Sequence, residues 1–209
     1  MRKLRFISSA TTFVLLLAGF GTAGAAEKEN GKRKANDPQG VERLMGRTGG
    51  EARVSVSDAT GAVSFVGFEA GFHGDLMAES TAGAREKARA FVHEYSRMLG
   101  LQDDAEVSLV GERTDKLGQR HLTFEQSYRG VPVFAGMVRA HFEGDGRLVA
   151  VNGNLIPGIR VNPVPSRSAT DAAAMAIALI SGENEGREVY ARSGILTIYR
   201  TGLARGTDG

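Results

Sequence analysis

Apolar residues recur at steps of three and four between residues 84 and 99, which is the spacing of one face of a helix. The stripe consists of Ala84, Ala88, Phe91, Val92, Tyr95 and Leu99. Ser80 or Thr81 is expected to cap the start of this helix, and Gly100 to end it. Because only one face is apolar, we expect the helix to pack that face on a sheet.

Alternation of apolar and polar residues predicts strands on both sides of the helix. Before it, weak alternation around the turn sequence Asp58-Ala59-Thr60-Gly61 predicts two short strands within 53–68. After it, the pattern predicts three strands in close succession and one that precedes them; they cover 122–128, 133–142, 147–154 and 107–110. We expect Gly130 to take a positive φ in the first connection, and Glu143-Gly144-Asp145-Gly146 to form a hairpin turn.

The prolines indicate a boundary after these strands. Three of the five fall within 157–165, which predicts a stiff, extended connection. Ser168 and Asp171 then resemble a capping box, with Asp in place of the usual Glu, and a helix is expected as far as Gly182. Short strands are expected near 189–190 and at 195–199. One helix and two short strands bury an apolar face poorly, so this second unit looks incomplete.

The first 26 residues have the pattern of a secretory signal. Arg2, Lys3 and Arg5 precede the apolar run 13–20, which is short for a membrane span of ~20 residues. Small residues predict cleavage near Ala25 or Ala26. We therefore expect a secreted protein, extracellular or periplasmic, without a stable membrane anchor after cleavage.

Charge and composition narrow the function of the mature chain. The formal charge of +2 belongs to the full chain and depends on the leader, because residues 27–209 hold 23 basic and 24 acidic residues, a net charge of −1. Nucleic-acid binding thus loses its compositional support. Residues 27–50, with Lys32-Arg33-Lys34, read as a flexible linker with at most a short helical turn near 41–45. The basic triplet has a second reading as a processing or nucleic-acid patch.

The stretch His121-Leu122-Thr123-Phe124-Glu125-Gln126-Ser127-Tyr128-Arg129-Gly130-Val131-Pro132-Val133-Phe134 resembles the fungalysin/thermolysin propeptide (FTP) domain. Its recognisable residues, structural or at an interface, are Gln126, Tyr128, Gly130, Val131, Pro132, Val133 and Phe134. The resemblance continues through Val151-Asn152-Gly153 and covers about 51–158. Residues 159–209 resemble, more weakly, the opening of a PepSY module without its closing strand.

The resemblance implies the N-terminal pro-region of a secreted thermolysin- or fungalysin-like zinc metalloprotease, a chaperone and inhibitor of its catalytic domain. That domain is absent from this chain, so its partner is expected in cis or in trans. Zinc, with calcium as an open second metal, is implied for the catalytic domain and no cofactor for this chain. The alternatives are a free-standing exported inhibitor or chaperone that acts in trans, and an extracellular binding module unrelated to proteases.

These readings together predict an α+β fold of two small cystatin-like units, each a helix packed on an antiparallel sheet, the second incomplete. The expected organisation is a signal at 1–26, a linker at 27–50, an FTP-like domain at 51–158 and a partial PepSY-like module at 159–209.

No catalytic or metal-binding residue is expected in this chain. The nearest approach to a zinc-peptidase motif is His93-Glu94-Tyr95-Ser96-Arg97, in which Arg97 stands where the second His is needed. A guanidinium has no lone pair to bind a cation. The chain has no Cys for a thiolate site, and no Gly-x-Ser-x-Gly elbow.

Two histidines are candidates for a pH-sensing pair. If residues 129–132 form a tight hairpin, His121 and His141 fall nearly opposite each other on neighbouring strands. Histidine changes charge between pH 5 and 8, so protonation of both rings is expected to loosen the domain. The alternative is two unrelated sheet histidines.

Overall fold

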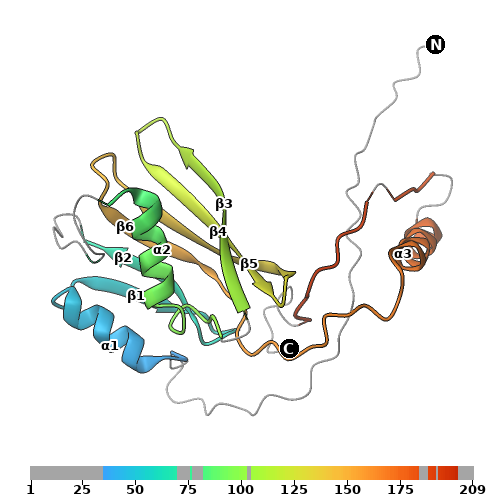
Figure 1. Cartoon of the computed structure of the whole chain (residues 1–209), viewed down its shortest axis with the longest axis horizontal. Helices are drawn as coiled ribbons and strands as arrows, with labels where there is room; N and C mark the ends of the chain where they lie inside the picture. Colours follow the sequence, from blue (N-terminus) through green and yellow to red (C-terminus); the bar gives the residue numbers. More distant parts are fainter. Residues whose placement is uncertain are drawn as a thin grey trace.

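The computed structural model describes residues 35–69, 76, 82–102, 105–183, 188–191 and 193–201. Six strands in this part of the chain form one antiparallel sheet in the order β1-β2-β6-β5-β4-β3 (Figure 1). The strands are β1 Ala52–Val56, β2 Val63–Phe68, β3 Ala105–Thr114, β4 Arg120–Tyr128, β5 Val131–Phe142 and β6 Leu148–Asn154. The helices are α1 Pro38–Arg47, α2 Ala84–Glu94 and α3 Ala169–Glu183. The mixed α+β class predicted from the sequence is confirmed.

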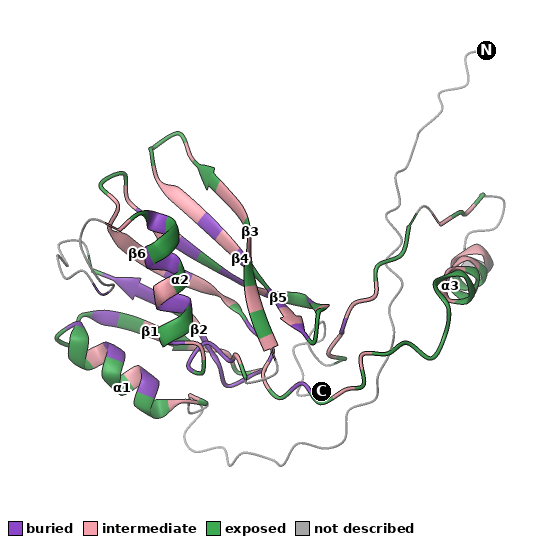
Figure 2. Cartoon of the chain, viewed as in Figure 1, coloured by how far each residue is buried: buried purple, intermediate pink, exposed green. Residues whose placement is uncertain are grey.

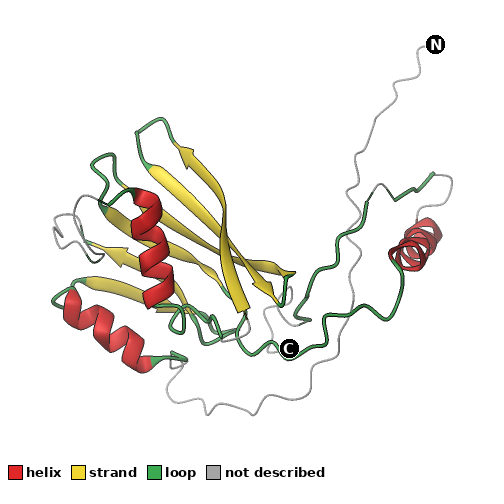
Figure 3. Cartoon of the chain, in the orientation of Figure 1, coloured by secondary structure: helices red, strands yellow, loops and turns green. Residues whose placement is uncertain are grey.

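Both α1 and α2 lie on one face of the sheet, and in the described part of the chain the opposite face carries no helix (Figures 1 and 3). The main core fills the space between helices and sheet, as the buried positions in Figure 2 show. Phe91 of α2 is fully buried, with its ring centroid 6.5 Å from that of Phe68 and 4.8 Å from that of Tyr95. The predicted packing of the α2 stripe on a sheet is therefore confirmed.

The strands at 52–68 join the same sheet because β2 pairs with β6. The first unit is thus a six-stranded sheet with two helices. Helix α2 ends earlier than the stripe suggested, and turns carry the chain on to Gly100, which has φ +98°. The N-cap residue of α2 is Gly83, and no side chain forms a capping hydrogen bond there. The predicted caps Ser80 and Thr81 lie outside the described residues, as do the leader and its cleavage site at Ala25 or Ala26.

Helix α1 corrects the prediction of a flexible linker at 27–50, as far as that segment is described. Asp37 caps the helix by accepting a hydrogen bond from the Gly40 amide at 2.9 Å, and Pro38 opens its first turn. Leu44 is fully buried in the main core. A ten-residue helix needs few apolar residues to anchor one face, so the polar composition of this segment concealed the helix.

The segment after the prolines corrects the prediction of a second sheet. Helix α3 forms with the expected capping box, in which Ser168 Oγ accepts from the Asp171 amide at 3.1 Å. The strands expected near 189–190 and at 195–199 are not formed; Ile198 makes one isolated parallel bridge to Val133 instead. Two short strands alone have too few neighbouring strands to make a stable sheet. The part of β5 around Val133 lies outside its pairing with β6, which begins at Met137, and it gives Ile198 a hydrogen-bonding partner. The cystatin-like description of the units stays a prediction.

Among the described residues, no helix is both long and apolar enough to span a bilayer.

Candidate functional site

The motif residues singled out in the sequence lie on β4, β5 and the turn that joins them. Arg129 and Gly130 are the two turn residues, with φ +49° and +79°. Positive φ at both positions is the geometry whose twist suits a two-residue hairpin, and it confirms the prediction for Gly130. The turn sets the register in which Tyr128 faces Val131 and Ser127 faces Pro132.

Gln126 holds this hairpin to the chain that leaves β6. Its side chain is 1% exposed, and its Nε2 donates to the carbonyl oxygen of Ile156 at 2.9 Å. The amide of Ile156 donates back to Gln126 Oε1 at 2.8 Å. A Cβ at Gly136 would lie 2.7 Å from the same Oε1, so glycine there makes room for the buried amide. Gln126 therefore has a structural role, because a buried amide of this kind must be paired.

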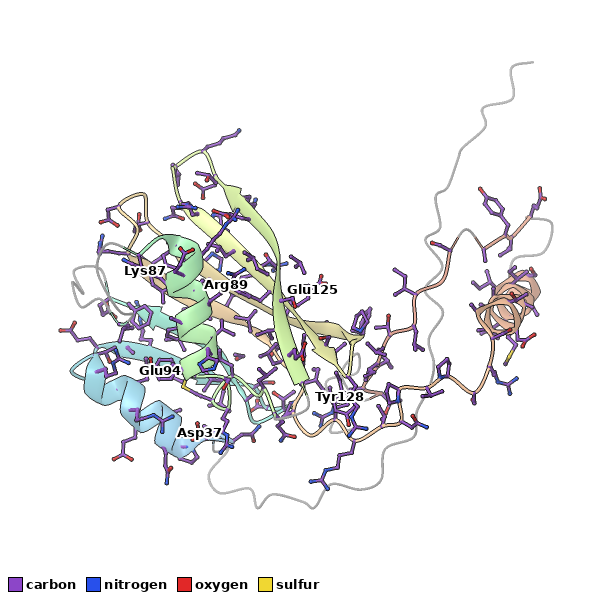
Figure 4. All side chains as sticks on the ribbon, viewed as in Figure 1. Asp37, Lys87, Arg89, Glu94, Glu125 and Tyr128 are labelled. Atoms are coloured by element: carbon purple, nitrogen blue, oxygen red, sulfur yellow. The ribbon has the colours of Figure 1, made fainter. Side chains whose placement is uncertain are left out.

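A second, smaller core lies at this end of the sheet; its buried members are Tyr128, Val133, Ile156, Ile159 and Ile198. Figure 4 labels Tyr128 at the end of β4, where this core begins. The Phe134 amide donates to Ile198 O at 2.8 Å, and the Ile198 amide donates to Pro132 O at 2.9 Å. Phe134 is 39% exposed, and its ring centroid lies 5.5 Å from that of Tyr199. Phe134, Pro132 and the turn thus remain the accessible part of the motif.

The face of the sheet without helices carries a chain of four polar side chains. His121 on β4 and His141 on β5 are register partners, and their Nδ1 atoms are 2.7 Å apart. His121 Nε2 lies 3.0 Å from Asp115 Oδ2, and His141 Nε2 lies 2.6 Å from Asn152 Oδ1. The structure thus brings together the two predicted histidines. Their response to pH stays a prediction.

Sequence reasoning missed Asp115 and Asn152, the two ends of this chain. Asp115 Oδ1 accepts the amides of Leu117 and Gln119, which fixes the turn between β3 and β4. The hydrogen bond from His121, with help from these two amides, holds the pKa of Asp115 below its usual range. Asn152 lies on β6, two strands from His121. The alternation of apolar and polar residues along β6 predicts that Asn152 lies on the sheet face without helices. Only the order of the strands in the sheet places it beside His141.

An ion-pair cluster links α2 to the sheet on the helix-covered side. Glu112 on β3 accepts from Arg120 of β4 and from Arg85 of α2. The hydrogen bond from Arg120, followed by that from Arg85, lowers the pKa of Glu112. This cluster positions α2 over β3 and β4, and it has no geometry suited to catalysis.

Peptidase chemistry finds no support in the described part of the chain. His93 is exposed on α2, and Arg97 follows in the turns after that helix. No group of three or more His, Asp or Glu side chains able to hold a metal ion occurs among the described residues. The described residues thus offer no ligand set for a zinc centre.

The strands β3 to β6 and their turns have counterparts in known proteins. Residues 105–155 match the Fungalysin/Thermolysin Propeptide Motif. This is a propeptide motif homologous to those of thermolysin-type precursors. It includes Gln126, both motif strands and the His121–His141 pair.

Similar curated proteins are proteases. A thermolysin of Alicyclobacillus acidocaldarius is 44% identical over 61 residues, which are 29% of this chain and 11% of that protein. A thermolysin of Bacillus caldolyticus matches with the same figures. The thermostable neutral protease NprT of Geobacillus stearothermophilus is 36% identical over 87 residues, or 39% of this chain and 16% of that protein. The chain therefore matches only a small fraction of the length of these relatives.

Proposed function

We propose that this chain is the pro-region of a secreted thermolysin-like zinc metalloprotease, and that it binds the catalytic domain, assists its folding and inhibits it until cleavage. The observation that carries the proposal is the propeptide motif at 105–155, which forms the four strands β3 to β6. These strands make up most of the sheet, so the motif is the body of the folded unit rather than an appended segment.

A pro-region works by contact, and the fold supports contact. Gln126 and the second core fix the β4–β5 hairpin, while Phe134 and the turn stay accessible beside it. A surface held in one conformation loses little entropy on binding. We propose this hairpin, with Phe134 as its aromatic anchor, as part of the surface that meets the catalytic domain.

Modest affinity suffices for a tethered inhibitor. A linked partner experiences an effective concentration of order millimolar. With an intrinsic Kd of ~1 μM, about 99.9% of the enzyme is then bound, and its folded state gains about 4 kcal/mol. Cleavage of the tether removes this advantage and lets the complex dissociate on dilution.

The remaining parts are proposed from sequence. Residues 1–26 serve as the secretory signal, and zinc, with calcium as an open addition, belongs to the catalytic domain. Residues 159–209 are proposed as a partial PepSY-like module. This fits the exposure of Met175 and Leu179 on α3, which are 55% and 70% exposed. An apolar helix of this kind needs a further surface to cover it.

The decisive experiment adds the full chain in trans to a separately expressed thermolysin-type catalytic domain, and measures both peptidase inhibition and the yield of active enzyme on refolding. We expect inhibition at micromolar concentration and a higher refolding yield. A Phe134→Ser variant should inhibit about tenfold less, since aromatic anchors dominate interfaces. The matched control is Leu117→Ser, at a turn position that is 84% exposed and far from the hairpin. A folded chain with neither effect would favour a binding module unrelated to proteases.

A further inference from the structure

The histidine pair on the open face imposes a constraint on where its protons lie. The two rings are inclined at 73° with centroids 5.0 Å apart, and the Nδ1 atoms lie at hydrogen-bonding distance, 2.7 Å. Two bare lone pairs at that separation repel each other, so a proton must lie between them. The question is which ring supplies it, and the outer partners of the two rings decide this.

The hydrogen-bond partner of His121 Nε2 fixes which nitrogen of that ring carries a hydrogen. The carboxylate of Asp115 only accepts, so His121 Nε2 carries a hydrogen, and in the neutral ring Nδ1 is an acceptor. The outer partner of His141 is an amide, which offers a donor on one side and an acceptor on the other. Asn152 presents Oδ1 to His141 Nε2, so that this nitrogen also carries a hydrogen. In the arrangement in which both Nε2 atoms carry hydrogens, the proton between the Nδ1 atoms is an extra one, and the pair then carries one positive charge.

We propose that Asp115, His121, His141 and Asn152 form a one-proton binding site, in which rotation of the Asn152 amide lets the pair gain or lose a proton without breaking the chain of hydrogen bonds. In the neutral state the Asn152 NH2 group donates to His141 Nε2, and His141 Nδ1–H donates to His121. On uptake of a proton the amide turns, His141 Nε2–H donates to Oδ1, and the Nδ1 atoms share the remaining proton. Three ring protons then occupy four ring nitrogens.

A second proton has no place in this arrangement. It would set two N–H groups against each other across 2.7 Å and make both rings cationic. The charged groups facing the pair are Arg113 opposite His121 on β3, Arg139 two residues before His141 on β5, Asp115, and Glu143, which lies on the same side of the sheet beside Gln119. Toward β6, among the residues that the structure describes, the pair faces the uncharged Ala150 and Asn152. The two arginines oppose a second charge, so a second proton separates β4 from β5 at this end.

With this site, the folded unit keeps its hydrogen bonds when the histidine pair binds one proton and is destabilised when the pair binds a second. In acid the two histidines of the unfolded chain take up two protons, whereas the folded pair takes up one. Below the pH at which the unfolded chain binds the second of these protons, the unfolding equilibrium constant therefore rises by up to about tenfold for each unit by which the pH falls. Coupled to inhibition, this would release a propeptide in acid; that consequence rests on the proposed function, whereas the proton site does not.

The test is a pH titration of the full 15N-labelled chain by long-range 1H–15N spectra of the histidine rings, with no protease present. We expect His141 to be an Nδ1–H tautomer at high pH and to gain an Nε2 hydrogen on uptake of the first proton, while His121 keeps its Nε2 hydrogen throughout. Independent titration of two Nε2–H rings would overturn the proposal.

Asn152→Asp is the diagnostic variant. A carboxylate accepts only and adds a negative charge, so it should hold the pair in its protonated form and raise the titration midpoint by about one pH unit or more. Asn154→Asp is the matched control, because it adds the same charge two residues along β6, opposite Met137 rather than a histidine. Equal shifts in the two variants would contradict the proposal. The wild-type spectra decide the question by themselves if either variant fails to fold.

Discussion

The side-chain amide of Gln126 and the backbone of Ile156 form a closed pair of hydrogen bonds, at 2.9 and 2.8 Å, across a sequence separation of 30 residues. Gln126 belongs to the motif hairpin, and Ile156 to the segment that leaves the sheet toward the prolines. This contact joins the two and orients Ile156 into the second core. It explains in physical terms why a glutamine, rather than an apolar residue, occupies a buried strand position.

Replacing Gln126 by Leu should destabilise the chain by ~2–4 kcal/mol, because both the N–H and the C=O of Ile156 lose their partner while still buried. Urea unfolding measures the change. Gln102→Leu, at an exposed position, is the control and should shift stability by less than ~0.5 kcal/mol. Equal stability of the two variants would contradict the structural role of Gln126.

Helix α1 is predicted to be part of the folded unit. Leu44→Ala should cost ~2–5 kcal/mol, because Leu44 is fully buried in the main core. The exposed neighbour Glu42→Ala should change stability by less than ~0.5 kcal/mol in the same urea titration. A small effect at Leu44 would return residues 38–47 to the status of a linker.

Two glycines should respond to alanine in opposite directions. A Cβ on Gly153 would lie 2.1 Å from Met137 O, so Gly153→Ala should cost at least the ~3 kcal/mol at the upper end of overpacking effects. Gly46 lies in α1, and a Cβ added there would meet no atom within 4 Å beyond its chain neighbours and the backbone of its own helix, so Gly46→Ala should stabilise by ~0.5 kcal/mol. Thermal unfolding of both variants checks the pair. Destabilisation by Gly46→Ala would argue against a helix there.

The Glu112 cluster should make stability depend on pH in acid. The pKa of Glu112 is lowered in the folded state, chiefly by the hydrogen bond from Arg120. As the pH falls, the carboxylate is therefore protonated in the unfolded chain before it is protonated in the folded one. The contribution is present above the ordinary carboxyl pKa of about 4.3 and is lost as pH falls through the lower folded value. Glu112→Gln should therefore flatten the stability profile between about pH 5 and 3. Glu106→Gln, at an exposed position on the same strand, should leave the wild-type slope unchanged.

Local sequence features determined most of the elements. The stripe at 84–99 and the alternation at 122–154 specify a helix and three strands, because side chains repeat every 3.6 residues in a helix and every two in a strand. Gly130 fixed the turn of the hairpin, whereas a bulge between Glu125 and Ser127, with three extra residues on β5, shifts the register so that His121 lies opposite His141. The motif residues also sufficed to predict the propeptide resemblance at 105–155.

Only the tertiary structure decided what depends on distant partners. Helix α1 has a polar composition and becomes a core element through Leu44, which is buried in a cluster that also includes residues of α2 and of strands far along the chain. The pairing of β2 with β6 decides where the strands at 52–68 join the sheet. Ile198 bridges to β5 instead of building a second sheet, and Asn152 reaches His141 only through the strand order. Such long-range contacts depend on the packing of the whole chain, whereas periodicity and turn residues act over a few neighbouring positions.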